Sequence, residues 1–115
     1  MENKEKLEQQ INIMHDRICS ALGDPKRILI LYLLAEQEYC VNEISETLEL
    51  PQSTVSRHLR VLRERGLVLT ERKGTSIYYS LADKRIIAAL ELMRGILVSQ
   101  WEARADLAQI LNFFE

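Results

Sequence analysis

Apolar residues recur at intervals of three and four along the first part of the chain, which is the spacing of one face of an α-helix. The stripe consists of Leu7, Ile11, Met14, Ile18 and Ala21. It predicts a helix over residues 2–22, ended by Gly23. Asp24 then precedes Pro25, an aspartate cap followed by a residue that suits the first helical position. A second helix is therefore expected over residues 25–35, and its nearly continuous apolar run predicts a central position.

Two short helices joined by a tight turn are predicted next. After a polar connection at residues 36–40, the apolar spacing predicts a helix over residues 41–48. Pro51 favours an extended residue before it and suits the first turn of the following helix, which is expected over residues 52–65. Two helices at this separation form a helix-turn-helix unit, here over residues 41–65.

The pattern changes from helical spacing to alternation after this unit. The alternating positions are Ile77, Tyr79 and Leu81 against Ser76, Tyr78 and Ser80. With a turn at Lys73-Gly74-Thr75, they predict a β-hairpin, or wing, over residues 67–81. Helical spacing returns from Asp83 to residue 114, as one helix or as two broken near Gly95. The expected fold is mostly α with a small β-hairpin, a single winged helix-turn-helix domain.

The charges are unevenly distributed along this short chain. Its 115 residues, 47% of them hydrophobic, fit one domain with a small core. The formal net charge is -2, yet residues 51–75 hold six basic and two acidic side chains, a balance of +4 that leaves -6 for the remainder. Such asymmetry predicts a local polyanion-binding patch on an otherwise anionic protein.

The sequence contains no apolar stretch long enough to cross a membrane. Its first ten residues are highly charged and lack the features of a signal peptide. We therefore expect a cytoplasmic protein without a membrane partner. In that compartment Cys19 and Cys40 are expected to be free thiols and not a structural disulfide.

The helix over residues 52–65 carries the patch. At 100° per residue, Val55, Leu59 and Leu62 share a narrow arc and should face the core. Small hydroxyl and arginine side chains lie opposite, where they suit close approach to a duplex and contacts with phosphates or guanine edges. His58 lies nearer the core arc and is a weaker candidate. The expected DNA-contacting residues are Gln52, Ser53, Thr54, Ser56, Arg57, His58 and Arg60, with Arg72 and Lys73 at the wing tip.

The sequence resembles the ArsR/SmtB family of winged helix-turn-helix repressors from about Ile18 to Leu97. The segments that show the resemblance are "ALGDPKRILIL", "EYCVNEISETLELPQSTVSRHLRVLRERGLV" and "RKGTSIYYSL". The resemblance implies a homodimeric cytoplasmic transcriptional repressor, with helices at residues 2–22 and 83–114 forming the dimer interface. A two-fold dimer of this kind would bind double-stranded DNA at an inverted-repeat operator.

Relatives of this kind commonly release DNA when a metal or metalloid binds or when thiols are oxidised. Arsenic-sensing members begin the third helix with Cys-x-Cys, whereas this chain has Cys40-Val41-Asn42 and lacks the second thiol. Zinc-sensing members use a carboxylate and histidines on the helix after the wing. Here that helix has no histidine, and Asp83 is better interpreted as its cap.

Three interpretations of the remaining donors stay open. His15 and Cys19 are four residues apart on one helix face, so they are weak candidates for ligands of a metal ion cofactor. Cys40 would join them only where the first and third helices approach each other, within one chain or across the dimer. A disulfide or polysulfide bridge between Cys19 and Cys40 would instead make a thiol switch, with release by oxidation or persulfidation. In the third interpretation, both are ordinary cysteines beside a surface histidine.

Two other classes of function compete with DNA binding. A winged helix can serve as a protein-interaction module, whose helix docks an acidic partner, although the local +4 balance favours DNA. An enzyme is not expected. The only histidines are His15 and His58, and the sequence has no Gly-rich phosphate loop and no recognisable catalytic constellation.

Overall fold

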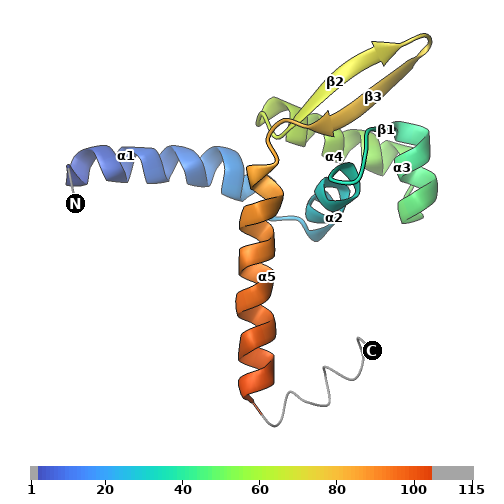
Figure 1. The fold of residues 1–115 in the computed structure, drawn as a ribbon. Helices are drawn as coiled ribbons and strands as arrows, with labels where there is room; N and C mark the ends of the chain where they lie inside the picture. The colour runs from blue at the N-terminus through green and yellow to red at the C-terminus, as the bar shows by residue number, and fades with distance from the viewer. Residues whose placement is uncertain (1–2, 105–115) are drawn as a thin grey trace. The chain divides into compact units, whose positions relative to one another are not determined.

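The computed structural model describes residues 3–104 and shows a mostly helical chain with a small antiparallel sheet (Figure 1). The chain divides into two compact units, one ending at Asp83 and one beginning at Lys84. The elements of the first unit are α1 (Lys4–Met14), the π-helical segment η1 (His15–Cys19), α2 (Pro25–Leu34), β1 (Tyr39–Cys40), α3 (Val41–Leu48), α4 (Gln52–Glu64), β2 (Val68–Lys73) and β3 (Ser76–Leu81). The second unit contains α5 (Arg85–Ala103).

The first helical region differs from the prediction in its last turns, which are π-helical. At the end of η1 the Ser20 N–H donates to the His15 carbonyl, five residues earlier. The Asp16 carbonyl, within η1, accepts the Ser20 hydroxyl and the Arg65 guanidinium. A π-helical segment has no distinctive apolar spacing, so the sequence pattern gave no sign of it.

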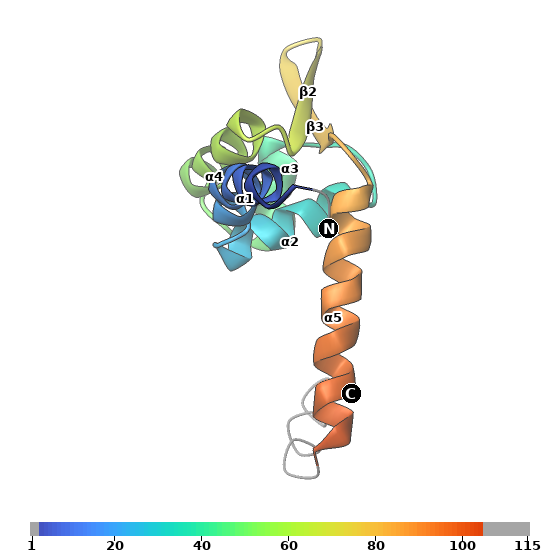
Figure 2. The same ribbon diagram turned by 90° about the vertical axis from the view of Figure 1, so that its left-hand side faces the viewer.

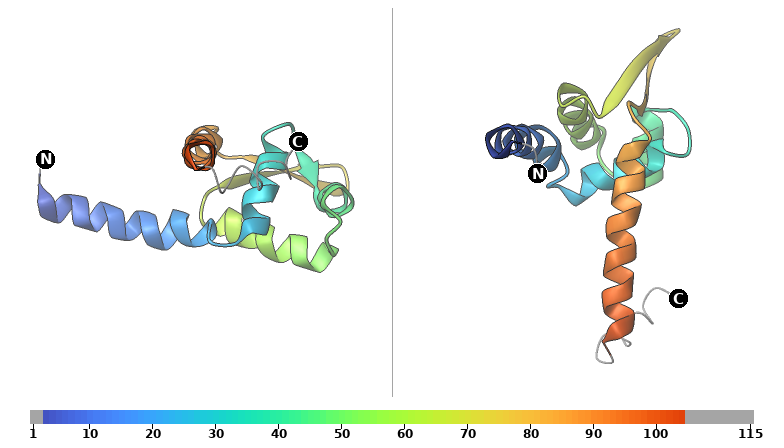
Figure 3. Two further views of the ribbon diagram at one scale, coloured as in Figure 1. Left: turned by 90° about the horizontal axis from the view of Figure 1, so that it is seen from below. Right: turned by 60° about the vertical axis from the view of Figure 1, so that its left-hand side comes forward.

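Most of the apolar stripe of this first helical region lies on the surface. Ile11, Met14 and Ile18 are 46%, 47% and 39% exposed, whereas Ala21 at the end of the stripe is buried. Figure 3 shows α1 extending away from α2, α3 and α4. The stripe is therefore available to another molecule.

The core of the first unit lies where α2, α3 and α4 meet. Asp24 caps α2 as predicted, because its Oδ1 accepts the Lys26 N–H at 2.9 Å. The fully buried side chains are Ile30 and Leu31 of α2, Ile44 of α3, Val55, Leu59 and Leu62 of α4, and Val68 of β2. The central position predicted for the second helix is confirmed.

Two backbone features fix the ends of the helix-turn-helix unit. Glu49 adopts a left-handed conformation with φ 55°, and the Leu50 N–H donates to the Ser45 carbonyl at 3.1 Å, closing α3. At the end of α4, Gly66 has φ 76°, and Leu67 N–H donates to the Leu62 carbonyl at 2.9 Å. This bond, six residues in span, belongs to a Schellman motif, in which glycine avoids the steric cost of the left-handed conformation.

The sheet has three strands in the order β1-β3-β2, one more than the predicted hairpin. The segment expected as a polar connection contains β1, whose Tyr39 and Cys40 pair with Tyr79 and Tyr78 of β3. A strand of two residues is too short to show an alternating pattern. The predicted hairpin itself is present, with Gly74 at φ 63° in its turn, and Figure 2 shows it projecting beyond the helices of the first unit.

The second unit contains one continuous helix through Gly95, which settles the alternative that the sequence left open. Its N-cap residue is Lys84, so the assignment of the cap to Asp83 was one residue too early. The predicted helix extended to residue 114, and its last part lies outside the described residues. Several large apolar side chains of α5 are exposed: Leu92, Met93, Ile96, Leu97 and Val98.

Candidate nucleic-acid interface

The outer face of α4 presents the small polar and arginine side chains that the helical pattern placed there. Gln52, Ser53, Ser56, Arg57 and Arg60 are exposed, and Thr54 is half-buried. The opposite face is held by Val55, Leu59 and Leu62, all fully buried. Because the buried face fixes the rotation of the helix, the outer face is presented in one orientation. Short side chains in its first turn leave the positively polarised helix end open to an anion.

His58 is buried, which corrects its assignment as a DNA contact. Its side chain is only 3% exposed. Its Nε2 lies 3.8 Å from Asp24 Oδ2, and its Nδ1 lies 3.5 Å from Arg27 Nη1. Its helical angle lies at the edge of the core arc, and the N-terminal end of α2 covers it there. His58 therefore joins α4 to α2 and does not reach a base edge.

The electrostatic surroundings of His58 favour its neutral form. Burial lowers the pKa of the imidazole, and the positive charges of Arg27, Arg57 and Lys26 lower it further against the opposing effect of Asp24. The pKa of Asp24 is itself lowered, chiefly by the Lys26 N–H that its carboxylate accepts. The contact therefore pairs a carboxylate with a histidine that resists protonation.

The two cations of the predicted wing tip are in different environments. Arg72 is exposed, whereas the Lys73 ammonium forms an ion pair with Glu38 and lies 5.4 Å from the centre of the Tyr78 ring. The hydrogen bond to Glu38 raises the pKa of Lys73. Alternation along β2 places Arg72 and Lys73 on opposite faces of the sheet. Lys73 thus ties the wing to the segment before β1.

Two residues that the sequence did not assign to a site lie beside the outer face of α4. Arg63 of α4 and Tyr79 of β3 line a hollow with Ser56, Arg60 and Glu64. Arg63 is three residues after Arg60, a spacing that could have identified it as part of the same surface. Tyr79 could not have been found this way, because only the folded sheet brings it near α4.

The structure does not bring the candidate metal ligands together. His15 and Cys19 lie in η1, whereas Cys40 ends β1 and is the N-cap residue of α3. Among residues 3–104, no three histidine, cysteine or acidic side chains are grouped so that they could hold a metal ion. The set His15, Cys19 and Cys40 is therefore not a metal site within one chain.

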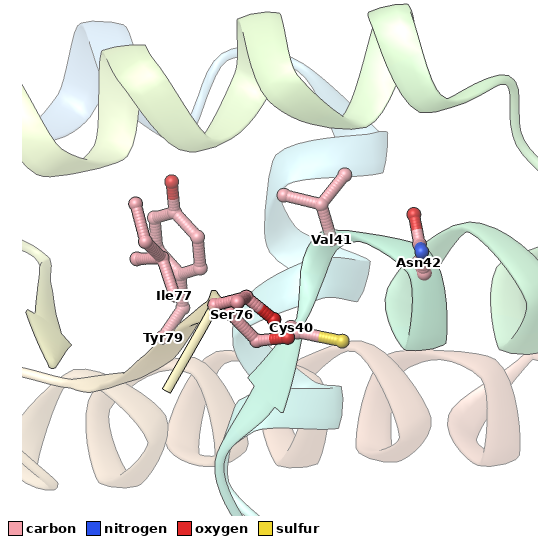
Figure 4. Close-up of a pocket in the computed structure, with 7 residues that line it drawn as sticks. Cys40, Val41, Asn42, Ser76, Ile77 and Tyr79 are labelled. Atoms are coloured by element: carbon pink, nitrogen blue, oxygen red, sulfur yellow. The ribbon is translucent and has the colours of Figure 1, made fainter. Parts of the chain in front are cut away.

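Both cysteines are free thiols, as the sequence predicted. Cys19 is exposed, and Cys40 is half-buried at the N-terminus of α3, where its N–H donates to Glu43 Oε1 at 3.0 Å. Hydrogen bonds from the backbone and side chain of Cys40 lower the pKa of Glu43. Cys40 also lines a shallow pocket of about 280 Å³ with residues that include Val41, Asn42 and Ile77 (Figure 4).

None of the helices in the described part of the chain is both long and apolar enough to span a membrane.

Comparison with known proteins identifies the family. Residues 24–70 match the family described as bacterial regulatory protein, arsR family. HlyU of Vibrio cholerae, a transcriptional activator, is 37% identical over 79 residues, which is 69% of this chain and 73% of HlyU. The structure of reduced HlyU matches with a TM-score of 0.70 and 32% identity, covering 80% of this chain and 96% of that one. The chain belongs to the ArsR family.

Two further proteins resemble this ArsR-family chain. A transcriptional repressor SmtB homolog of Synechocystis sp. is 43% identical over 68 residues, which is 59% of this chain and 52% of that protein. The chain thus spans about half the length of that curated relative. The homodimeric winged helix-turn-helix DNA-binding domain Mb0332 of Mycobacterium bovis matches with a TM-score of 0.75 and 26% identity, covering 90% of this chain and 95% of that one.

We expect the stability of the ArsR-family domain to fall as the pH drops below the ordinary pKa of histidine, about 6.5. The pKa of His58 is lower in the folded protein than in the unfolded one, so the unfolded state binds the extra proton first. The stabilisation is complete above pH 6.5 and is lost as the pH falls through the folded-state pKa. Urea unfolding at fixed protein concentration between pH 7.5 and 5.5 measures this loss.

In this experiment His58→Gln should flatten the pH dependence of the free energy of unfolding. Equal pH dependence in the wild type and His58→Gln would show that His58 does not contribute to it.

Proposed function

We propose that this protein is a cytoplasmic, sequence-specific DNA-binding transcriptional repressor of the ArsR type, acting as a homodimer on an inverted-repeat operator. The observation that supports it most directly is the outer face of α4. This face combines exposed Arg57 and Arg60 with small hydroxyl side chains, and its buried side prevents rotation. A guanidinium can pair with guanine or with phosphate through two parallel hydrogen bonds.

The exposed apolar side chains of the two terminal helices support a dimer. Ile11 and Met14 of α1 and Leu92 and Ile96 of α5 are between 46% and 73% exposed. Apolar surface of this kind on two helices is typical of a protein interface. The similar Mb0332 domain is homodimeric. In a two-fold dimer the α4 helices would enter successive major grooves about 34 Å apart.

Repression is preferred to activation because the SmtB homolog is a repressor, although HlyU is named as an activator. A winged-helix module that binds an acidic protein is the alternative. The cationic outer face of α4 would suit both partners. Only DNA binding, however, predicts affinity for a duplex that falls steeply with salt, as phosphate contacts release counterions.

Arg57→Ala should weaken binding to the preferred duplex by roughly tenfold or more, the loss expected for one bidentate contact to guanine. The preferred duplex is obtained by repeated selection of a random pool on the wild-type protein. Binding is measured by fluorescence anisotropy, and sedimentation confirms that the variant keeps the oligomeric state of the wild type. Affinity equal to that of the wild type would refute the assignment of Arg57 to the recognition face.

We further propose that thiol modification releases the protein from DNA. Two features support this idea: the Cys19 thiol is exposed, and Cys40 caps α3, the helix that precedes the recognition helix. Added sulfur atoms at Cys40 would crowd its contact with Glu43 and disturb the start of α3. The competing hypothesis of a metal site has less support, because no three histidine, cysteine or acidic side chains of the described residues are grouped closely enough to bind a metal ion.

Treatment with polysulfide should lower DNA affinity in the wild type and leave Cys19→Ser/Cys40→Ser unaffected. The two single variants identify which thiol is required, and mass spectrometry of the treated proteins reports the modification. If the double variant loses DNA affinity as the wild type does, neither thiol is the sensor.

A further inference from the structure

A hollow of about 540 Å³ lies between the recognition helix and the wing. Ser56, Arg60, Arg63 and Glu64 of α4 line it on one side, and Tyr79 of β3 lines it on the other. Residues 56, 60 and 63 are four and three positions apart, so they form one row along the helix. Ser56 and Arg60 also belong to the outer face of α4, and Arg63 and Glu64 extend the hollow along the flank of the helix that is turned toward the sheet.

The hollow contains hydrogen-bond donors that find no acceptor among the described residues. Across residues 3–104, the guanidinium groups of Arg60 and Arg63 and the hydroxyl of Tyr79 make no hydrogen bond or ion pair. Figure 4 shows the Tyr79 hydroxyl pointing toward α4. Arg65 differs from these arginines, because its guanidinium donates to the Asp16 carbonyl. The unused donors are thus found on the wing side of the helix.

The charge and size of the hollow restrict what it can bind. Two guanidinium groups and the Glu64 carboxylate give a net charge of +1, which suits a group with a single negative charge. A phosphate diester carries one such charge, and its two free oxygens accept hydrogen bonds from guanidinium and hydroxyl groups. The volume is many times the roughly 30 Å³ of a water molecule in the liquid, so a phosphate and its adjoining sugars can enter.

We propose that this hollow binds one backbone phosphate diester of the DNA, held by Arg60 and Arg63 with Tyr79 as an additional donor. The inference rests on the proposed function, because the duplex must lie along α4 for a phosphate to arrive there. A phosphate contact fixes position and not sequence. The site therefore sets how far α4 enters the groove relative to the wing. Glu64 at the same hollow weakens the attraction.

Substitutions that remove a positive or a negative charge from the hollow test the site in the full-length protein. Arg63→Ala should weaken binding by roughly tenfold on the preferred and random duplexes alike, as expected for one charge-assisted contact. It should also reduce the salt dependence by about one phosphate contact. Glu64→Gln should strengthen binding, and Tyr79→Phe should weaken it severalfold.

Neutral methylphosphonate linkages, placed one at a time in the preferred duplex, locate the contact. At one position in each half-site, the neutral linkage should lower the DNA affinity of the wild type. It should leave the affinity of Arg63→Ala unchanged, since the variant has already lost that contact. Circular dichroism confirms that the variants are folded.

Two outcomes are decisive against the site. Wild-type affinity in Arg63→Ala would overturn it, and so would an equal methylphosphonate effect at every position in the two proteins. A wild-type protein that binds no duplex at all would instead contradict the proposed function.

Discussion

The packing of one face of α4 against the helical core is the contact on which the rest of the structure depends. Val55, Leu59 and Leu62 are fully buried, and burial of each such side chain contributes about 1.5–3 kcal/mol. A helix fixes the angles between its residues. Packing the apolar face against the core therefore determines which side chains the opposite face exposes. Arg57 and the small hydroxyl side chains need no contacts of their own to point outward.

Polar contacts at the edges of α4 complete this arrangement and divide the cations by role. His58 joins one edge of the helix to Asp24, and Arg65 at its end donates to the Asp16 carbonyl of η1. On the wing, Lys73 forms an ion pair with Glu38. The positive patch recognised in the sequence is therefore not one uniform surface. Arg65 and Lys73 hold the fold, while the exposed arginines of α4 remain for a partner.

The sequence predicted the parts of the fold that depend on local periodicity. The helix-turn-helix and the hairpin were expected within a residue or two of their observed bounds, because each buries one face at a regular spacing. The two-residue strand β1 and the π-helical segment η1 were missed, because neither has a regular spacing of apolar residues. The outer face of α4 was predictable, but the burial of His58 and the pairing of Lys73 with Glu38 depend on segments distant in sequence.

We propose that α4 reads the major groove as one of a symmetric pair of helices. Methylation of guanine N7, which lies in the major groove, tests this arrangement when interference with binding is mapped along the selected duplex. Two clusters of interfering guanines are expected about one helical turn apart, related by the symmetry of the operator. A single cluster, or binding that is indifferent to N7 methylation at every guanine, would contradict it.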